Sequence, residues 1–269
     1  MPRRFSLAHL TVLACPPYES VRIAADVGYD FVSFRNMALR LPGEPIYDFS
    51  ADKALFQETR TALRETGIPL LDLEVARIID GIDVKSYLPA LEKGAELGAH
   101  HVITCGLSKD PVYTQESFDQ LCDMAQPLGL TIDFEFISFA DVNHISQVMQ
   151  IIRKSGRKNA GLLVDSLHYG RSRITTAELD AVPRELFHFS QLRDAPDKPH
   201  FTREELIATA RGQCLYLGEG DIPIKTMLSH MPDIPLSLEV CNPTRAEAIG
   251  YKEFARKCLT TAKSYFSTP

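Results

Sequence analysis

The sequence has no closely spaced pair of cysteines. Its six cysteines are scattered along a chain of 269 residues, at Cys15, Cys105, Cys122, Cys214, Cys241 and Cys258. In a chain of this length, such spacing argues against both a disulfide framework and a zinc knuckle. It indicates reduced thiols and predicts a cytoplasmic protein.

The sequence also has little positive charge. It contains 29 lysines and arginines against 35 aspartates and glutamates, which gives a formal net charge of −6. There is no run of basic residues interleaved with aromatic residues, and nucleic acids bind faces rich in positive charge. We therefore expect no nucleic-acid partner.

No apolar run approaches the roughly 20 residues that a membrane-spanning helix needs. The first residues include two arginines and a short apolar segment, but His9 and Thr11 interrupt it and no small-residue cleavage site follows. A first β-strand over residues 6–13 is therefore better supported than a signal peptide. We expect no membrane association.

Short apolar runs alternate with amphipathic segments along the whole chain, with a period of about 30 residues. The apolar runs predict strands over 6–13, 29–35, 69–78, 100–106, 131–136, 160–168, 186–195 and 235–240. The segments between them predict helices over 17–28, 52–67, 86–98, 116–129, 145–156, 175–182, 222–231 and 245–266.

This alternation predicts an α/β fold, a (β/α)8 TIM barrel of eight parallel strands with helices outside. An open doubly wound sheet is the alternative, but a glycine-rich phosphate-binding loop is missing after the first strand. The chain is 45% hydrophobic and has no evident linker, which predicts a single domain over residues 1–269. Residues 197–220, with a helical pattern over 203–212, are too long for an ordinary loop and are predicted to fold over the barrel mouth.

Four polar residues lie at the ends of four consecutive predicted strands. They are Glu135, Asp165, Gln191 and Glu239. The carboxyl ends of parallel barrel strands meet at one rim, and carboxylates that meet there repel unless a cation lies between them. Each residue alone could instead cap the helix that follows its strand. Together they predict a metal site, and oxygen ligands favour Mg²⁺ or Mn²⁺, with Co²⁺ or Zn²⁺ as less suited alternatives.

His168 follows Asp165 by three residues, in the sequence VDSLHYGR. It is a candidate acid–base group pointing into the same mouth. Alternatively, its ring only binds a loop carbonyl. A triad with Ser166 is a weaker alternative, since the Gly-x-Ser-x-Gly motif is absent.

Arg77 follows the third predicted strand and is a candidate for binding a carboxylate or hydroxyl group of a substrate. A surface arginine paired with Asp80 or Asp83 is the alternative. Arg193 and Arg245 are further substrate-binding candidates, with weaker support.

Three other features are less decisive. Glu74 is expected to face the barrel interior or to support a ligand. Residues 217–223, LGEGDIP, predict either a turn that brings backbone close to the site or an ordinary turn before the next helix. His100 and His101 begin the fourth strand at the opposite end of the barrel, so a structural role is expected.

Several motifs together resemble those of the xylose isomerase-like barrel superfamily, in its sugar phosphate isomerase/epimerase branch. They cover nearly the whole chain: SLAHLTVL, AADVGYDFVSFR, ALEKGAELGAHHVITCG, DFEF, VDSLHYGR, SQLRDAP, LGEGDIP and SLEV. The resemblance implies a metal held by Glu, Asp, His and Glu on strands five to eight. These positions correspond to Glu135, Asp165, Gln191 and Glu239, with Gln191 in place of the usual histidine.

The resemblance implies an isomerase or epimerase that acts on a small polyhydroxylated carbonyl compound through an enediolate. Glu135 and Glu239 would then transfer the protons, and the metal would act as a Lewis acid. The glutamine, His168 and Arg77 are also similar to bacterial 3-dehydroshikimate dehydratases, so dehydration of a cyclic keto substrate of that type, or of an inosose, is the alternative, with His168 as the acid. A catalytically silent barrel that serves as a binding subunit is the third. Members of this superfamily often form dimers or tetramers, so a homo-oligomer is also expected.

Overall fold

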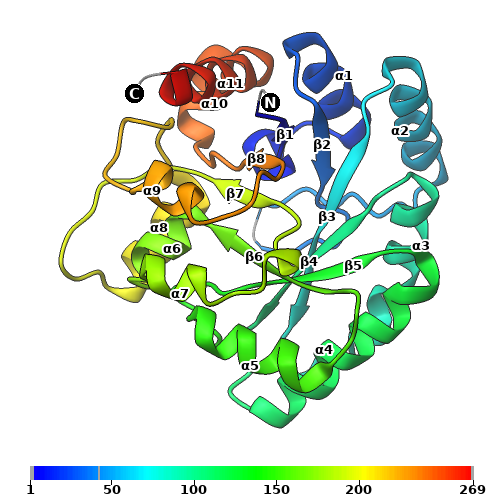
Figure 1. Ribbon diagram of the computed structural model, residues 1–269. Coiled ribbons are helices and arrows are strands. Elements are labelled where there is room, and N and C mark those ends of the chain that lie inside the picture. The colour runs from blue at the N-terminus through cyan, green and yellow to red at the C-terminus, as the bar shows by residue number, and fades with distance from the viewer. Residues whose placement is uncertain (1–2, 42, 268–269) are drawn as a thin grey trace.

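The computed structural model describes residues 3–41 and 43–267, which form a closed barrel of eight parallel strands (Figure 1). The strands are β1 Phe5–Leu7, β2 Phe31–Phe34, β3 Leu70–Ile78, β4 His101–Gly106, β5 Thr131–Glu135, β6 Ala160–Asp165, β7 Ser190–Leu192 and β8 Leu236–Leu238. Each strand pairs with the next, and β8 pairs with β1 to close the barrel. The predicted (β/α)8 fold is therefore confirmed.

Helices surround the strands. They are α1 Pro17–Val27, α2 Lys53–Thr66, α3 Leu88–Glu96, α4 Pro111–Ala125, α5 Ile145–Ser155, α6 Ser166–Arg171, α7 Thr176–Asp180, α8 Arg203–Gly212, α9 Ile224–Ser229, α10 Pro243–Ile249 and α11 Tyr251–Ser267. Short 3₁₀ helices are η1 His9–Val12, η2 Val84–Tyr87, η3 Gln126–Leu128 and η4 Arg184–Leu186. No helix among the described residues is long and apolar enough to cross a membrane.

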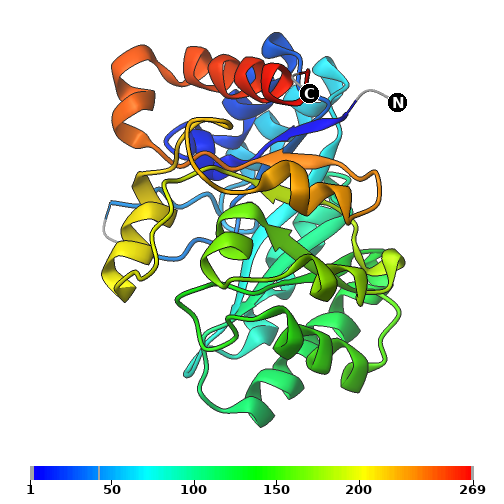
Figure 2. The ribbon, with the colours of Figure 1, turned by 60° about the vertical axis from the view of Figure 1, so that its left-hand side comes forward.

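The longer outer helices bury one apolar face and end where the chain must turn. In α5, for example, Val148, Met149 and Ile152 are buried. The helix ends at Gly156, whose φ of 63° places it in the left-handed region that glycine adopts without strain. The last helix, α11, packs against α1, so the ring of helices closes (Figures 1 and 2).

Several predicted elements were wrong in extent. The predicted strand 160–168 ends at Asp165, after which α6 begins, and the predicted strand 186–195 is only Ser190–Leu192. The first strand ends at Leu7 rather than at residue 13, because residues 9–12 form the 3₁₀ helix η1, in which Thr11 binds the end of the neighbouring strand β8 and the residue Val240 after it. The Thr11 hydroxyl donates to the carbonyl of Leu238 at 2.8 Å and accepts from the backbone N–H of Val240 at 2.9 Å. The last predicted helix, 245–266, is two helices, because Gly250 has a φ of 82° that no α-helix accommodates.

The barrel interior has distinct layers. Ile103, Leu163 and Phe189 form an apolar cluster inside it. Nearer the carboxyl ends of the strands, the register pairs Asp165 with Gln191. Since residues paired in a parallel sheet point to the same face, the polar strand ends project together into the top of the barrel.

His9 is a fully buried residue at the start of η1, just after β1. Its Nδ1 accepts from the backbone N–H of Arg35 at 2.9 Å, so its Nε2 carries the proton and lies 3.0 Å from the carbonyl of Cys15. Burial lowers the pKa of His9 to about 4. The ring therefore stays neutral in the folded protein at ordinary pH.

We predict that His9 makes the folded protein less stable as the pH falls from about 6.5 towards 4. In that range the unfolded chain takes up a proton at its ordinary pKa, whereas folded His9 does not. Between about pH 7.5 and pH 5 the loss attributable to His9 should be about 2 kcal/mol. Urea unfolding at both pH values, for the unaltered chain and for His9→Gln, gives the difference, and an equal pH dependence in both proteins would refute the assignment.

Candidate functional site

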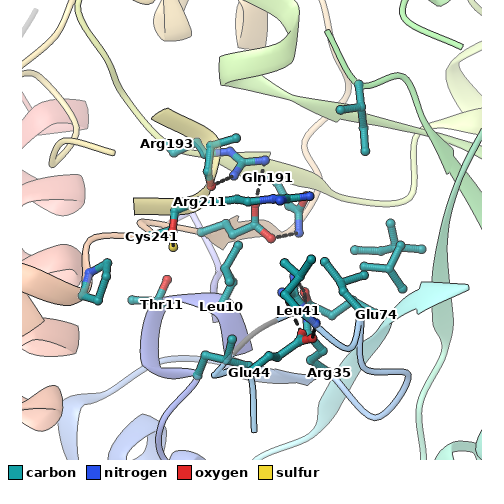
Figure 3. Close-up of a pocket in the computed structure, with 18 of the residues that line it drawn as sticks. Leu10, Thr11, Arg35, Leu41, Glu44, Glu74, Gln191, Arg193, Arg211 and Cys241 are labelled. Atoms are coloured by element: carbon teal, nitrogen blue, oxygen red, sulfur yellow. Dashed lines mark hydrogen bonds and ion pairs between the residues drawn. The ribbon is translucent and has the colours of Figure 1, made fainter. Parts of the chain in front are cut away.

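A cavity of about 440 Å³ opens at the carboxyl ends of the strands (Figure 3). Its polar lining residues include Thr11, Arg35, Glu44, Glu74, Arg77, Glu135, His168, Gln191, Arg193, Arg211, Glu239, Asn242, Glu247 and Tyr251. Three of the four polar strand-end residues thus face one space. The fourth, Asp165, is fully buried and is not among the lining residues in the described part of the chain.

The guanidinium of Arg193 lies among the carboxylates at the base of this cavity. Its Nε is 2.8 Å from Asp165 Oδ2, and its Nη2 is 2.7 Å from Glu239 Oε2 and 3.9 Å from Glu135 Oε1. Arg193 is two residues beyond Gln191, so both side chains point into the barrel. The structure therefore places a fixed cation where the sequence predicts that a metal must offset the negative charge.

The carboxylates have strongly perturbed acidity. Burial raises the pKa of Glu239 to about 8, although the Arg193 guanidinium opposes the increase. Burial, followed by the charges of Asp165 and Glu239, raises the pKa of Glu135 well above its usual range. Burial also raises the pKa of Asp165. One guanidinium therefore does not fully neutralise this group of acids.

Asp165 also caps a helix. Its Oδ1 accepts from the backbone N–H groups of Leu167 and His168, at 2.7 and 3.1 Å, at the start of α6. Its Oδ2 accepts from Arg193. The helix-capping interpretation therefore describes part of what Asp165 does, and a metal would have to share its oxygens with these donors.

The remaining donors suit a hard cation. Gln191 Nε2 donates to Glu239 Oε1 at 3.1 Å, which leaves Gln191 Oε1 as its atom for coordination. Glu135 Oε1 is buried without a hydrogen-bond partner. Three carboxylates and one amide provide oxygen ligands only, which Mg²⁺ and Mn²⁺ prefer. The donor chemistry at the mouth therefore fits a hard divalent cation.

His168 lies between this cluster and a loop. Its Nδ1 faces Ser138, with the backbone N–H at 3.3 Å and the hydroxyl Oγ at 3.0 Å. Both ring nitrogens face a group that can only donate: the Ser138 backbone N–H faces Nδ1, and Arg193 Nη2 lies 3.4 Å from Nε2. Nε2 also lies 3.8 Å from Glu135 Oε1. Burial, with the charges of Arg193 and Arg171, lowers the pKa of His168 well below its usual value, so the ring is neutral.

Two arginines face the cavity without an ion pair among the described residues. Arg77 is not paired with Asp80 or Asp83, and its Nη2 donates to the carbonyl of Leu39 at 2.9 Å. Arg211, from α8, extends over the cavity in Figure 3. Burial and the charges of Arg77 and Arg35 lower the pKa of Arg211. These two guanidinium groups therefore add positive charge to the cavity wall.

Arg245 lies elsewhere. Its Nη1 pairs with Glu219 at 2.5 Å, its guanidinium stacks over the Tyr216 ring, and it is not among the described residues that line the cavity. The structure therefore does not bring Arg245 together with Arg77 and Arg193.

Other sequence features have structural explanations. Glu74 is buried and pairs with Arg35 at 2.6 Å. Ser166 donates to the carbonyl of Arg193 and forms no triad. Backbone N–H groups of Gly218 and Gly220 bind Asp194, so LGEGDIP is an ordinary turn built around that carboxylate.

Sequence patterns did not identify Arg211 or Ser138 as site residues. The only available signal for Arg211 was its place in the long segment expected over the mouth. That expectation holds in part, because Ala210 and Arg211 do line the cavity. In Figure 2, α8 and the loop after β2 lie on the same side of the barrel.

We predict that Arg193→Met lowers the free energy of unfolding by about 3 kcal/mol, because it leaves buried carboxylates without their counter-ion. Urea unfolding at neutral pH measures this loss. The matched control is Arg245→Met, which removes an exposed ion pair and should cost less than about 1 kcal/mol. Similar losses in the two variants would show that Arg193 does not neutralise the cluster.

Comparison with known proteins connects this chain to one family. A family model described as xylose isomerase-like TIM barrel matches residues 21–258. A 3-dehydroshikimate dehydratase of Pseudomonas aeruginosa is 26% identical over 275 residues, covering 91% of this chain but only 40% of that protein. An inosose isomerase of Bacillus licheniformis is 27% identical over 256 residues, covering 88% of this chain and 86% of that protein.

Solved structures share the fold at low identity. The IOLI protein with a bound zinc atom has a TM-score of 0.81 at 19% identity, with 98% of both chains covered. A D-allulose 3-epimerase from Methylomonas sp., in complex with D-allulose, has a TM-score of 0.70 at 16% identity, with 98% of both chains covered.

Proposed function

The chain belongs to the xylose isomerase-like TIM barrel family, and on that premise we propose that it is a divalent-metal-dependent dehydratase of a cyclic keto acid of the 3-dehydroshikimate type. The observation that carries this proposal is the pair of arginines, Arg77 and Arg211, that face the cavity without an ion-pair partner among the described residues. The dehydratase from Pseudomonas aeruginosa is a relative over most of this chain.

A carboxylate on the substrate explains these arginines. Guanidinium groups bind carboxylates by paired hydrogen bonds, and two neighbouring guanidinium groups repel each other until an anion lies between them. Burial and the charges of Arg77 and Arg35 lower the pKa of Arg211, as that repulsion requires. A neutral ketose or inosose has no charge to offer these groups.

Glu135, Asp165, Gln191 and Glu239 are the proposed ligands of the cation, and Mg²⁺ or Mn²⁺ fits their oxygen atoms better than Zn²⁺ or Co²⁺. When bound, the cation supplies a Lewis acid that polarises the carbonyl of the substrate. The zinc atom of the IOLI structure supports a metal in this fold without fixing its identity.

The chain's own residues move the protons. Glu135 takes the proton from the carbon next to the carbonyl, and a carbon–carbon double bond forms as the bond to the β-hydroxyl group breaks. Glu135 passes this proton to Nε2 of the neutral His168 ring, which lies 3.8 Å from Glu135 Oε1. The imidazolium then donates the proton to the departing hydroxide, which leaves as water, so both groups are restored.

Sugar isomerisation or epimerisation is the second candidate. Glu135 and Glu239 both line the cavity, and a pKa of about 8 lets Glu239 hold a proton near neutral pH and return it to the substrate. The inosose isomerases among the relatives support this candidate. Both reactions begin with the same proton abstraction.

A cytoplasmic location is part of the proposal. All six cysteines are free and buried, which suits a reducing compartment.

The first prediction of this function is a substrate assay. With Mn²⁺ present, 3-dehydroshikimate should lose water and give a catechol absorbance, while a panel of inososes and ketohexoses shows no deuterium uptake from D₂O. Deuterium entering a panel member next to its carbonyl, without any catechol, would instead establish the isomerase or epimerase.

The second prediction concerns Arg211. Arg211→Gln should raise the KM for 3-dehydroshikimate about 10- to 100-fold, the cost of one charged hydrogen bond, with a smaller change in kcat. Steady-state kinetics measures both, and Arg245→Gln is the control that should leave KM unchanged. An unaltered KM in Arg211→Gln would remove the carboxylate-binding role.

A further inference from the structure

A second group of metal-ligating side chains lies at the opposite end of the barrel from the cavity. His101 is the first residue of β4, Asp133 lies on β5 two residues before Glu135, and His188 precedes β7. Their ligand atoms all lie within 4.8 Å of one another. Among the described residues, no other set of three histidine, cysteine or carboxylate side chains is this close together. His101 is therefore part of a potential metal-binding group, beyond the structural role that its position at the start of a strand suggests.

Both imidazoles direct the same ring atom at one carboxylate. His188 Nδ1 is 2.6 Å from Asp133 Oδ1, and His101 Nδ1 is 3.3 Å from Asp133 Oδ2. The Asp133 side chain is only 1% exposed, whereas those of His101 and His188 are 16% and 22% exposed. The carboxylate is therefore fixed inside the barrel, and the two rings leave a route to solvent.

The neighbouring strand β6 leaves room for this arrangement. Gly161 is paired with Asp133 in the sheet, so its missing side chain would point into the cluster. A Cβ atom there would lie 2.6 Å from His188 Nδ1 and would also collide with Asp133 Oδ1. Only glycine at this position lets the three groups meet.

A further oxygen is within reach. The Thr131 hydroxyl lies 2.7 Å from His101 Nδ1 and donates to Asp133 Oδ2 at 2.8 Å. The hydroxyl proton of Thr131 is donated to Asp133, so in the contact with His101 the hydroxyl oxygen accepts and His101 Nδ1–H donates. A metal ion would replace the ring protons that now face Asp133 and Thr131.

We propose that His101, Asp133 and His188 form a second metal site, selective for a borderline transition ion such as Zn²⁺. Two imidazole nitrogens and one carboxylate are a ligand set that Zn²⁺ prefers, and solvent or Thr131 completes it. The proposed ligands at the cavity are all oxygen atoms, so the two ends of the barrel differ in the ion they select. Zinc here joins β4, β5 and the segment that leads into β7, as a structural site.

Zinc binding to the whole chain tests this site. After removal of bound metals and addition of saturating Mn²⁺ to occupy the cavity, one equivalent of Zn²⁺ should bind. In His188→Asn, zinc affinity should fall at least 100-fold while catalytic activity is kept. The matched control is His100→Asn, next to His101 in the chain and exposed, which should bind Zn²⁺ unchanged. Equal affinity in the two variants would overturn the proposal.

A second measurement needs no variant, in case the His188 substitution prevents folding. X-ray absorption of the unaltered chain with one equivalent of Zn²⁺ and saturating Mn²⁺ should show two imidazole ligands together with oxygen. A zinc shell of oxygen alone would place the ion at the cavity carboxylates and overturn the proposal.

Discussion

Offsetting buried negative charge is the constraint on which the cavity end of the barrel depends. Glu135, Asp165 and Glu239 are all buried, and such carboxylates cannot stay together and ionised without a cation. Arg193 supplies one positive charge among them. The pKa of Glu239 nevertheless rises to about 8, so the single charge of Arg193 does not balance the three carboxylates. The proposed divalent cation would supply the remaining positive charge.

The same physical problem is solved differently at the two ends of one barrel. At the cavity, an arginine and a proposed hard cation face oxygen ligands. At the opposite end, Asp133 is held by two imidazoles, with Gly161 leaving the necessary space. An apolar cluster that includes Ile103 and Leu163 forms part of the interior. Since residues inside a closed barrel are shielded from water, each polar group there needs a specified partner.

The rim position of four residues could be predicted because strand ends are visible in sequence. Short apolar runs ending in Glu135, Asp165 and Glu239 specify parallel strands, and barrel closure brings such ends together. The metal-ligand and catalytic roles of these residues stay predictions, as does the single domain. Arg211 could not be found in this way, because it comes from α8, a helix inside a long irregular segment with no strand to set its direction.

The sequence by itself determined the alternation of strands and helices, since that depends on local hydrophobic period and on glycines that end helices. It also placed Glu135, Asp165, Gln191 and Glu239 at or next to the carboxyl ends of β5 to β8. Only the tertiary structure decided which charges meet. Arg193, Arg211 and Arg245 are equivalent in chemistry, yet their surroundings differ. Arg193 lies among carboxylates, Arg211 lines the cavity near Arg77, and Arg245 pairs with Glu219. Side-chain direction and distance in space set these partners, and neither is encoded in spacing along the chain.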